Sequence, residues 1–277
     1  MFLGNLLTFL DRSMSTPQPY GVFHLVSFAL AIIVGVLLCI YCKDTARYAR
    51  RIVFITAVIV TVLEIYKQIN YTFSFDGTAI TADYQWYAFP WQFCSTPMYV
   101  GLLAGFTRGK LHDSLCTYLT TFAVFAGACV MFYPNDVFIS TIGINIQTMI
   151  CHGSMLTIGI YLLGSGYVKP EHKAILKAIP VFVAAVAVAV ILNEIAHATG
   201  LLQTDTFNMF FISPYCDPHL PVYSIVQQYV AFPWCLVLYI LGFSAAAYLM
   251  LLIAMGIKAI VAKTKTTKTE KQEIAIK

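Results

Sequence analysis

Seven long apolar stretches constrain the fold of this chain more than any other feature. A membrane-spanning helix needs about 20 mostly apolar residues, and each stretch reaches that length. The chain is 59% hydrophobic and 11% charged, whereas charged residues make up about a quarter of a soluble domain. We therefore predict an all-α polytopic membrane protein without a separate soluble module. The seven predicted transmembrane helices are residues 19–42, 49–70, 88–107, 112–133, 144–166, 174–199 and 230–261.

The basic residues lie on one side of these spans. The loops 71–87, 134–143 and 201–229 contain no Lys or Arg. The other side carries fifteen of the seventeen basic residues: Lys43, Arg47, Arg50, Arg51, Arg108, Lys110, Lys169, Lys173, Lys177, Lys258, Lys263, Lys265, Lys268, Lys271 and Lys277. The positive-inside rule predicts an outside N-terminus and a cytoplasmic C-terminus. The net charge of +4 comes from basic residues that are distributed by membrane side, so we predict no nucleic-acid partner.

Three parts of the chain are distinguished by composition. Residues 1–18 carry apolar residues at helical spacing, which predicts a short segment along the membrane surface. Residues 19–262 form the predicted seven-helix domain, and residues 263–277 a basic cytoplasmic tail. Of eight cysteines, only Cys216 lies in an outer loop, so no disulfide framework is expected. The predicted location is the cell membrane, with multiple passes, and the oligomeric state is left open.

The third predicted span contains a thiol beside a proline. Cys94 is followed by Ser95, Thr96 and Pro97. A proline inside a helix removes one N–H and crowds the carbonyl four residues earlier, here that of Phe93. We therefore predict a bend at Cys94, with a freed carbonyl that a neighbouring hydroxyl covers. The pattern also fits an ordinary packing kink with an inert cysteine.

Polar groups gather in the outer half of the predicted spans. The inner halves and the fourth span are expected to carry no titratable group. The outer set consists of His24, Glu64, Gln92, Thr96, Gln147, His152, Asn193, Glu194 and His197, with Cys94 in the same layer. Polar residues in spans tend to face the protein interior or water, which predicts an outward-facing hydrated cavity. His24 and Gln147 also fit simple interhelical hydrogen bonds, and Glu64 an internal ion pair with Lys67.

A thiol and an imidazole at similar depth meet the minimum for nucleophilic acyl transfer. The thiolate of Cys94 would attack, and His152 would accept its proton. Glu64, Asn193 or Glu194 could orient the imidazole, and Gln92 or Asn193 could stabilise an oxyanion.

Other chemistries use the same set of residues. Thr96 and Cys151 are alternative nucleophiles, although Cys151 cannot share a helix face with the adjacent His152. Glu194 and His197 match a Glu-x-x-His metal spacing, but a single such pair predicts no metal site, and no cofactor is expected.

Short motifs along most of the chain resemble a known family. The run Phe89-Pro-Trp-Gln-Phe-Cys94 resembles the Leu-Pro-Leu-His-Leu-Cys signature of the YwaF-type bacterial integral membrane proteins. His24, Glu64 and His152 fall where that family carries polar residues. The segment 193–234, ending in Phe-Pro-Trp, looks like the family's last loop and the start of its final helix. Gln92 stands where many bacterial members have His.

The resemblance implies a lipid enzyme. The YwaF-type family is similar to a eukaryotic transmembrane acyltransferase that moves a fatty acyl chain from a phospholipid to a lysophospholipid. A Cys–His pair is proposed there, and Cys94 and His152 occupy the matching positions. The expected function is thus a lipid acyltransferase or acyl-ester hydrolase acting on phospholipid or lysophospholipid. The alternative is a transporter or ligand-binding membrane protein that uses the same polar cavity.

Overall fold

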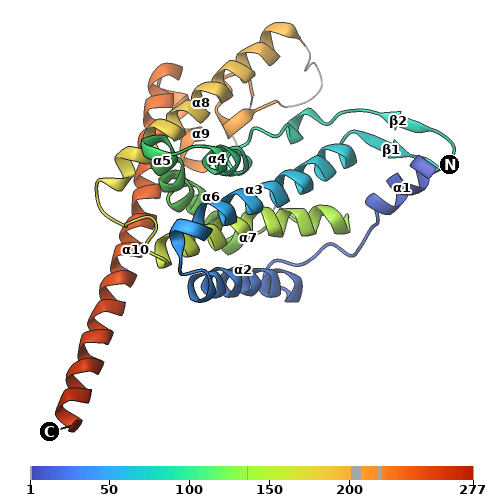
Figure 1. Ribbon diagram of the computed structural model, residues 1–277. Helices are drawn as coiled ribbons and strands as arrows, with labels where there is room; N and C mark the ends of the chain where they lie inside the picture. Colours follow the sequence, from blue (N-terminus) through green and yellow to red (C-terminus); the bar gives the residue numbers. More distant parts are fainter. Residues whose placement is uncertain (1, 136, 201–206, 217–219, 277) are drawn as a thin grey trace.

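The computed structural model describes residues 2–135, 137–200, 207–216 and 220–276, without the side chains of Pro221 and 265–276. The fold is helical, with one two-stranded hairpin (Figure 1). The helices are α1 (Phe2–Leu10), α2 (Val22–Tyr41), α3 (Thr45–Asn70), η1 (Trp86–Ala88), α4 (Thr96–Phe106), α5 (Gly109–Thr120), α6 (Phe122–Phe132), α7 (Ile142–Gly164), α8 (Ala174–Thr199), η2 (Met209–Phe211), α9 (Pro221–Tyr229) and α10 (Phe232–Ile276).

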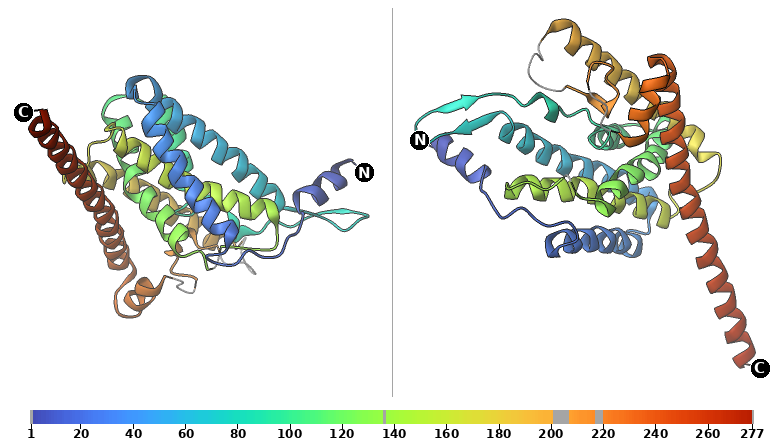
Figure 2. Two further views of the ribbon diagram at one scale, coloured as in Figure 1. Left: turned by 90° about the horizontal axis from the view of Figure 1, so that it is seen from below. Right: turned by 180° about the vertical axis from the view of Figure 1, so that it is seen from behind.

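Six helical segments are long and apolar enough to cross a membrane among the described residues: α2, α3, α5 with α6, α7, α8 and the first part of α10. The shorter apolar helix α4 occupies the second half of the predicted third span. The all-α, polytopic architecture predicted from the sequence is therefore confirmed. The backbone of α10 continues to Ile276, so the last span and the predicted tail form one helix that projects beyond the bundle (Figure 2).

The sequence predicted one bent helix for the third span, and the structure does not show it. Residues 93–95 form a turn, and α4 begins only at Thr96, so Pro97 lies in its first turn. There the missing N–H of proline costs little, because the first N–H groups of a helix have no intrahelical partner. The Thr96 hydroxyl donates to the Phe93 carbonyl at 2.8 Å, as predicted.

The fourth span is interrupted between α5 and α6. Thr121 has φ −123° and ψ −82°, outside the helical region. The hydroxyls of Thr120 and Thr121 both donate to the Thr117 carbonyl, at 2.9 and 2.7 Å. A broken helix in lipid needs such local partners for its backbone.

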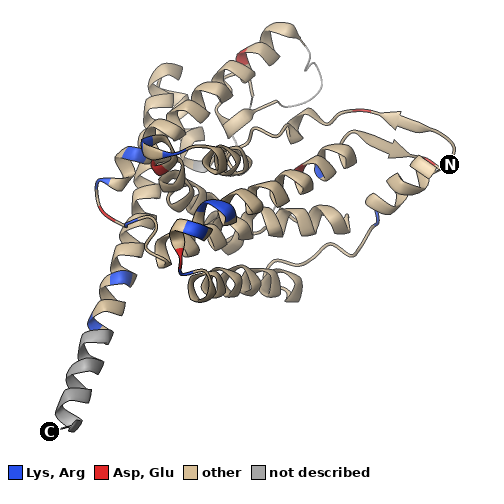
Figure 3. Ribbon diagram, viewed as in Figure 1, with Lys and Arg blue, Asp and Glu red and all other residues tan. Residues whose placement is uncertain are grey.

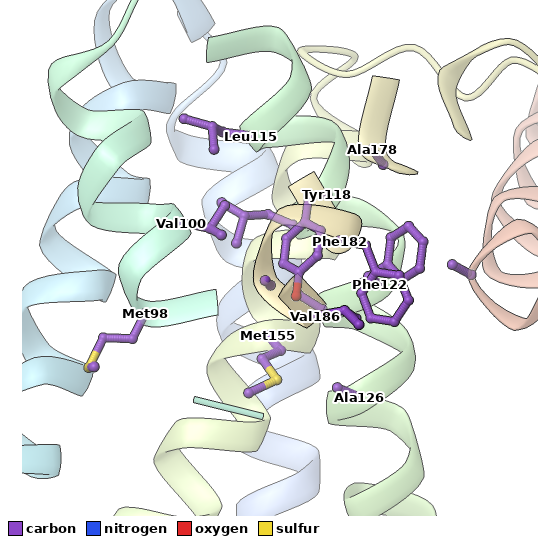
Figure 4. Close-up of a cluster of buried hydrophobic side chains, with 14 of the residues drawn as sticks. Met98, Val100, Leu115, Tyr118, Phe122, Ala126, Met155, Ala178, Phe182 and Val186 are labelled. Atoms are coloured by element: carbon purple, nitrogen blue, oxygen red, sulfur yellow. The ribbon is translucent and has the colours of Figure 1, made fainter. Parts of the chain in front are cut away.

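The core lies where α4, α5, α6, α7 and α8 meet (Figure 4). Phe122 of α6 stacks on Phe182 of α8, with ring centroids 4.4 Å apart. Tyr118 of α5 is fully buried, and its hydroxyl lies 2.7 Å from that of Thr96. The first turn of α4, directly after Cys94, is thus fixed to the core.

The hairpin extends from one end of the bundle. Strands β1 (Phe73–Phe75) and β2 (Ile80–Ala82) pair antiparallel. In its turn, hydrogen bonds from the Ala79 and Thr78 backbone and the Thr78 hydroxyl hold the pKa of Asp76 at about 2. Most Lys and Arg residues lie toward the opposite end (Figure 3). This separation agrees with the predicted topology, in which the hairpin is outside.

Candidate functional site

Two cysteines from different elements border one small cavity. Cys94 belongs to the turn before α4, and Cys151 to the middle of α7. The Cys151 thiol points at the Cys94 carbonyl, with the sulfur 3.8 Å from the oxygen. Both residues and Ser154 line a cavity of about 30 Å³, which has room for a water-sized molecule. Cys151, which the sequence analysis treated as a secondary candidate, is therefore the α7 thiol that meets Cys94.

The imidazole of His152 is buried in α7, one residue after Cys151. Its Nδ1 lies 2.8 Å from the Thr148 carbonyl. A carbonyl oxygen only accepts, so Nδ1 carries the proton and Nε2 is the basic atom of the neutral ring. Among the described hydrogen bonds of this region, none joins His152 to Cys94. The two residues lie on neighbouring elements.

Glu64 is the centre of a polar cluster at the outer end of α3. Its carboxylate is buried and forms an ion pair with Lys67 at 2.8 Å. The Nε2 groups of Gln68 and Gln147 donate to it at 2.7 and 3.3 Å. The Tyr84 hydroxyl, from the loop after the hairpin, donates to the Gln68 amide oxygen at 2.6 Å. The internal ion pair considered from the sequence is present, and Gln147 links it to α7.

Gln92 and Asn193 hold the loop that contains η2. The amide of Gln92 donates to the Asn208 carbonyl at 3.1 Å and accepts from the Phe210 N–H at 3.0 Å. The amide of Asn193 forms the same kind of double contact with Met209, at 3.1 and 2.8 Å. Phe210 has a φ of 58°, which a non-glycine residue rarely adopts. These two amides thus stabilise an unfavourable backbone beside the Cys94 turn.

The other residues predicted for the outer layer lie apart from this centre. His24 donates from Nε2 to the Met131 carbonyl at 2.9 Å and accepts from the Tyr20 N–H at 3.2 Å. The first bond joins α2 to α6, as the simpler interpretation predicted, and the second holds the residues just before α2. Glu194 and His197 are exposed, and both contact Tyr215. The predicted layer is thus divided into separate clusters rather than gathered around one cavity.

An apolar groove borders the thiol cavity. It has a volume of about 470 Å³ and lies between α2, α3 and α7. Thr56, Val60 and Ser154 line both the groove and the small cavity beside Cys94 and Cys151. The groove wall is otherwise mainly aliphatic, which suits a hydrocarbon chain.

The sequence model of the TMEM164 family, a family of transmembrane proteins, matches residues 15–255. The chain belongs to the TMEM164 family. No curated protein and no solved structure matches it. The TMEM164 match spans Cys94, Cys151 and His152. It also includes the Glu64 cluster and the amides of Gln92 and Asn193 that hold the η2 loop.

A second cysteine–histidine pair within the TMEM164 match was missed in the sequence analysis. His112 and Cys116 lie in α5, inside the candidate span Gly109–Phe132, and both are buried. The expectation that the fourth span lacks a titratable group is therefore wrong. The signal was the His-x-x-x-Cys spacing, since residues four apart share a helix face. It was overlooked because His112 lies at the very start of that span.

Proposed function

We propose that the protein is a membrane lipid acyltransferase or acyl-ester hydrolase, with Cys94 as nucleophile and His152 as general base. The observation that carries this proposal is that the apolar groove adjoins the thiol cavity, because Thr56, Val60 and Ser154 line both. A lipid acyl chain in the groove would bring its ester carbonyl toward Cys94. Membership of a transmembrane family agrees with a substrate that resides in the bilayer.

The proposed reaction has two steps. In the first, His152 accepts the thiol proton through Nε2, and the Cys94 sulfur attacks the ester carbonyl of a phospholipid. The C–O ester bond breaks, the lysophospholipid oxygen takes the proton from the imidazole, and an acyl thioester remains. In the second, the hydroxyl of a lysophospholipid or water attacks the thioester while His152 accepts its proton. The thiolate of Cys94 leaves and takes this proton back.

Supporting roles follow from the hydrogen bonds around the site. The Thr148 carbonyl keeps the basic nitrogen of His152 at Nε2. Gln92 holds the η2 loop against the turn that carries Cys94, and Asn193 holds the same loop from α8. In catalysis a general base must come within about 3 Å of the proton donor, so the proposal requires His152 to approach Cys94 when substrate is bound.

Intact-protein mass spectrometry after incubation with a defined phospholipid tests this function, with lysophospholipid release measured in parallel. Wild type is compared with Cys94→Ala and His152→Ala, and Cys151→Ala is the matched control from the same cavity. We expect a hydroxylamine-labile acyl adduct in wild type and Cys151→Ala and none in Cys94→Ala. Loss of the base should slow the reaction by about 10²- to 10⁴-fold.

Two results would contradict this assignment. An adduct that depends on Cys151 and persists in Cys94→Ala would move the nucleophile to α7. No adduct and no turnover with any of several headgroups would exclude the thioester mechanism. The groove would then be assigned to the alternative, binding or transport of a lipophilic ligand.

A further inference from the structure

The histidine of the second pair is held in one defined orientation. His112 Nδ1 lies 2.9 Å from the Ala104 carbonyl, at the end of α4. Because a carbonyl oxygen only accepts, Nδ1 carries the proton, and Nε2 of the neutral ring has the free lone pair. This nitrogen lies 3.4 Å from the Cys116 sulfur and 2.6 Å from the Tyr167 hydroxyl oxygen. The thiol of Cys116 therefore faces the basic atom of an oriented imidazole.

A polar cavity adjoins the buried Cys116. It has a volume of about 260 Å³ and is lined by Cys116, Thr117 and Tyr167, together with charged residues from α5, from the segment before α8 and from the first turn of α8. The charged lining residues are Asp113, Lys169, Glu171 and Lys177. The two lysines belong to the basic side of the predicted topology, so the cavity is expected to open to the cytoplasm. Lysine ammonium groups bind phosphate as point charges.

We propose that Cys116 is a second nucleophilic thiol, which accepts an acyl group from a phosphate-bearing acyl thioester on the cytoplasmic side. Cys116 and His112 provide the nucleophile and its base, and Lys169 and Lys177 bind the phosphate. Asp113 and Glu171 balance the overall charge, so the lysines act as local partners and not as a uniformly positive surface.

Thioester exchange fits this site because it needs no oxidant, reductant or metal. His112 Nε2 accepts the Cys116 proton while the sulfur attacks the thioester carbonyl. A new C–S bond forms to Cys116, and the original C–S bond breaks. The leaving thiolate takes the proton from the imidazolium. In the resting state Tyr167 donates to the same nitrogen, so its hydroxyl must turn away before Cys116 can transfer its proton.

This site is independent of the function proposed for Cys94. It uses other residues and another cavity, and it lies toward the opposite membrane face on the predicted topology. The test therefore uses the full chain with Cys94→Ala, in detergent, so that a failure at one site leaves the other unaffected.

The probe is palmitoyl-coenzyme A, and acylation at each cysteine is followed by peptide mass spectrometry with and without hydroxylamine. Cys129, an exposed cysteine of α6, reports uncatalysed acylation in the same sample. His112→Asn removes the base but retains a donor that can reach the Ala104 carbonyl. We expect Cys116 to react faster than Cys129, and His112→Asn to slow Cys116 alone by about 10²-fold or more. Equal rates at Cys116 and Cys129, or no effect of His112→Asn, would overturn the proposal.

A second measurement decides the matter if His112→Asn does not fold. The double variant Lys169→Gln and Lys177→Gln leaves the thiol and its base intact. It should raise the half-saturating concentration of palmitoyl-coenzyme A about tenfold, and leave the rate with a neutral acyl-N-acetylcysteamine thioester unchanged. The same half-saturating concentration in both proteins would refute the phosphate-bearing substrate.

Discussion

Cys94 and His152, in the outer half of the helix bundle, belong to different elements. His112 and Cys116, in the inner half, lie one turn apart on α5. The Cys94 carbonyl accepts from the Cys151 thiol, and His152 is turned toward its own helix at Thr148. The inner thiol lies directly against an imidazole. Spacing within one helix determines which side chains are neighbours. For residues on different helices, the position along each helix determines only their depth in the membrane. The rotation of each helix decides which of these residues meet.

The largest effect is expected from Glu64→Leu, which breaks the outer polar cluster. The substitution leaves Lys67 without its ion-pair partner and Gln147 without its acceptor. Gln68 loses one of its two acceptors and keeps the Ala88 carbonyl. Removing one partner of a buried pair costs about 3 kcal/mol of unfolding free energy. Thermal or chemical unfolding in detergent measures the loss.

The double variant Glu64→Leu with Lys67→Leu tests whether the unpaired lysine causes the loss of stability. Because it removes both charges, it should recover at least half of the lost stability. If the double variant is as unstable as the single one, the ion pair does not carry the energy of the cluster.

A smaller loss of stability is expected from Asn193→Leu, which removes the amide of α8 that holds the η2 loop. The Met209 N–H loses its acceptor, and the Met209 carbonyl keeps only the longer contact with the Ile212 N–H at 3.4 Å. Leaving buried backbone groups unsatisfied costs about 2 kcal/mol, and the outer lipid activity should fall with the loop disordered. Acylation of Cys116 should be unchanged, which would separate the two sites.

The control for this variant is Ile195→Leu, an exposed position on the same helix. It should leave both stability and activity near wild type. Wild-type stability of Asn193→Leu would show that this amide is not needed to hold the loop.

The smallest effect is expected from Tyr167→Phe, which tests the inner site formed by His112 and Cys116. Without the hydroxyl, the Cys116 thiol is the remaining polar partner of His112 Nε2 among the contacts described for that atom. One hydrogen bond contributes about 0.5–1.5 kcal/mol, so Cys116 should react with iodoacetamide about 2- to 10-fold faster.

Tyr248→Phe removes a comparable tyrosine–histidine contact, with His172, and should leave the rate at Cys116 unchanged. A slower reaction in Tyr167→Phe would mean that Tyr167 assists the thiol and does not compete with it.

The outer site was only partly predictable. The ion pair of Glu64 and Lys67 followed from helical spacing, and the hydroxyl of Thr96 covers the Phe93 carbonyl as expected. The third span was predicted to start at residue 88, but α4 starts at Thr96, because residues 88–95 have the apolar composition of a span and yet are not α-helical. Gln92 and Asn193 were candidates for an oxyanion site, yet their amides bind the backbone of the η2 loop. A loop of that kind has no periodic sequence signal.

The number and length of the apolar segments, and hence the polytopic helical fold, follow from the sequence alone, because burial in lipid requires long runs with satisfied backbone groups. The sequence also contained both pairs with local spacing, Glu64 with Lys67 and His112 with Cys116. The packing of the helices brings Cys151 to Cys94, Gln147 to Glu64, and two side-chain amides to the η2 loop. Such contacts depend on the rotation and packing of separate helices, which the polar pattern of one helix does not specify.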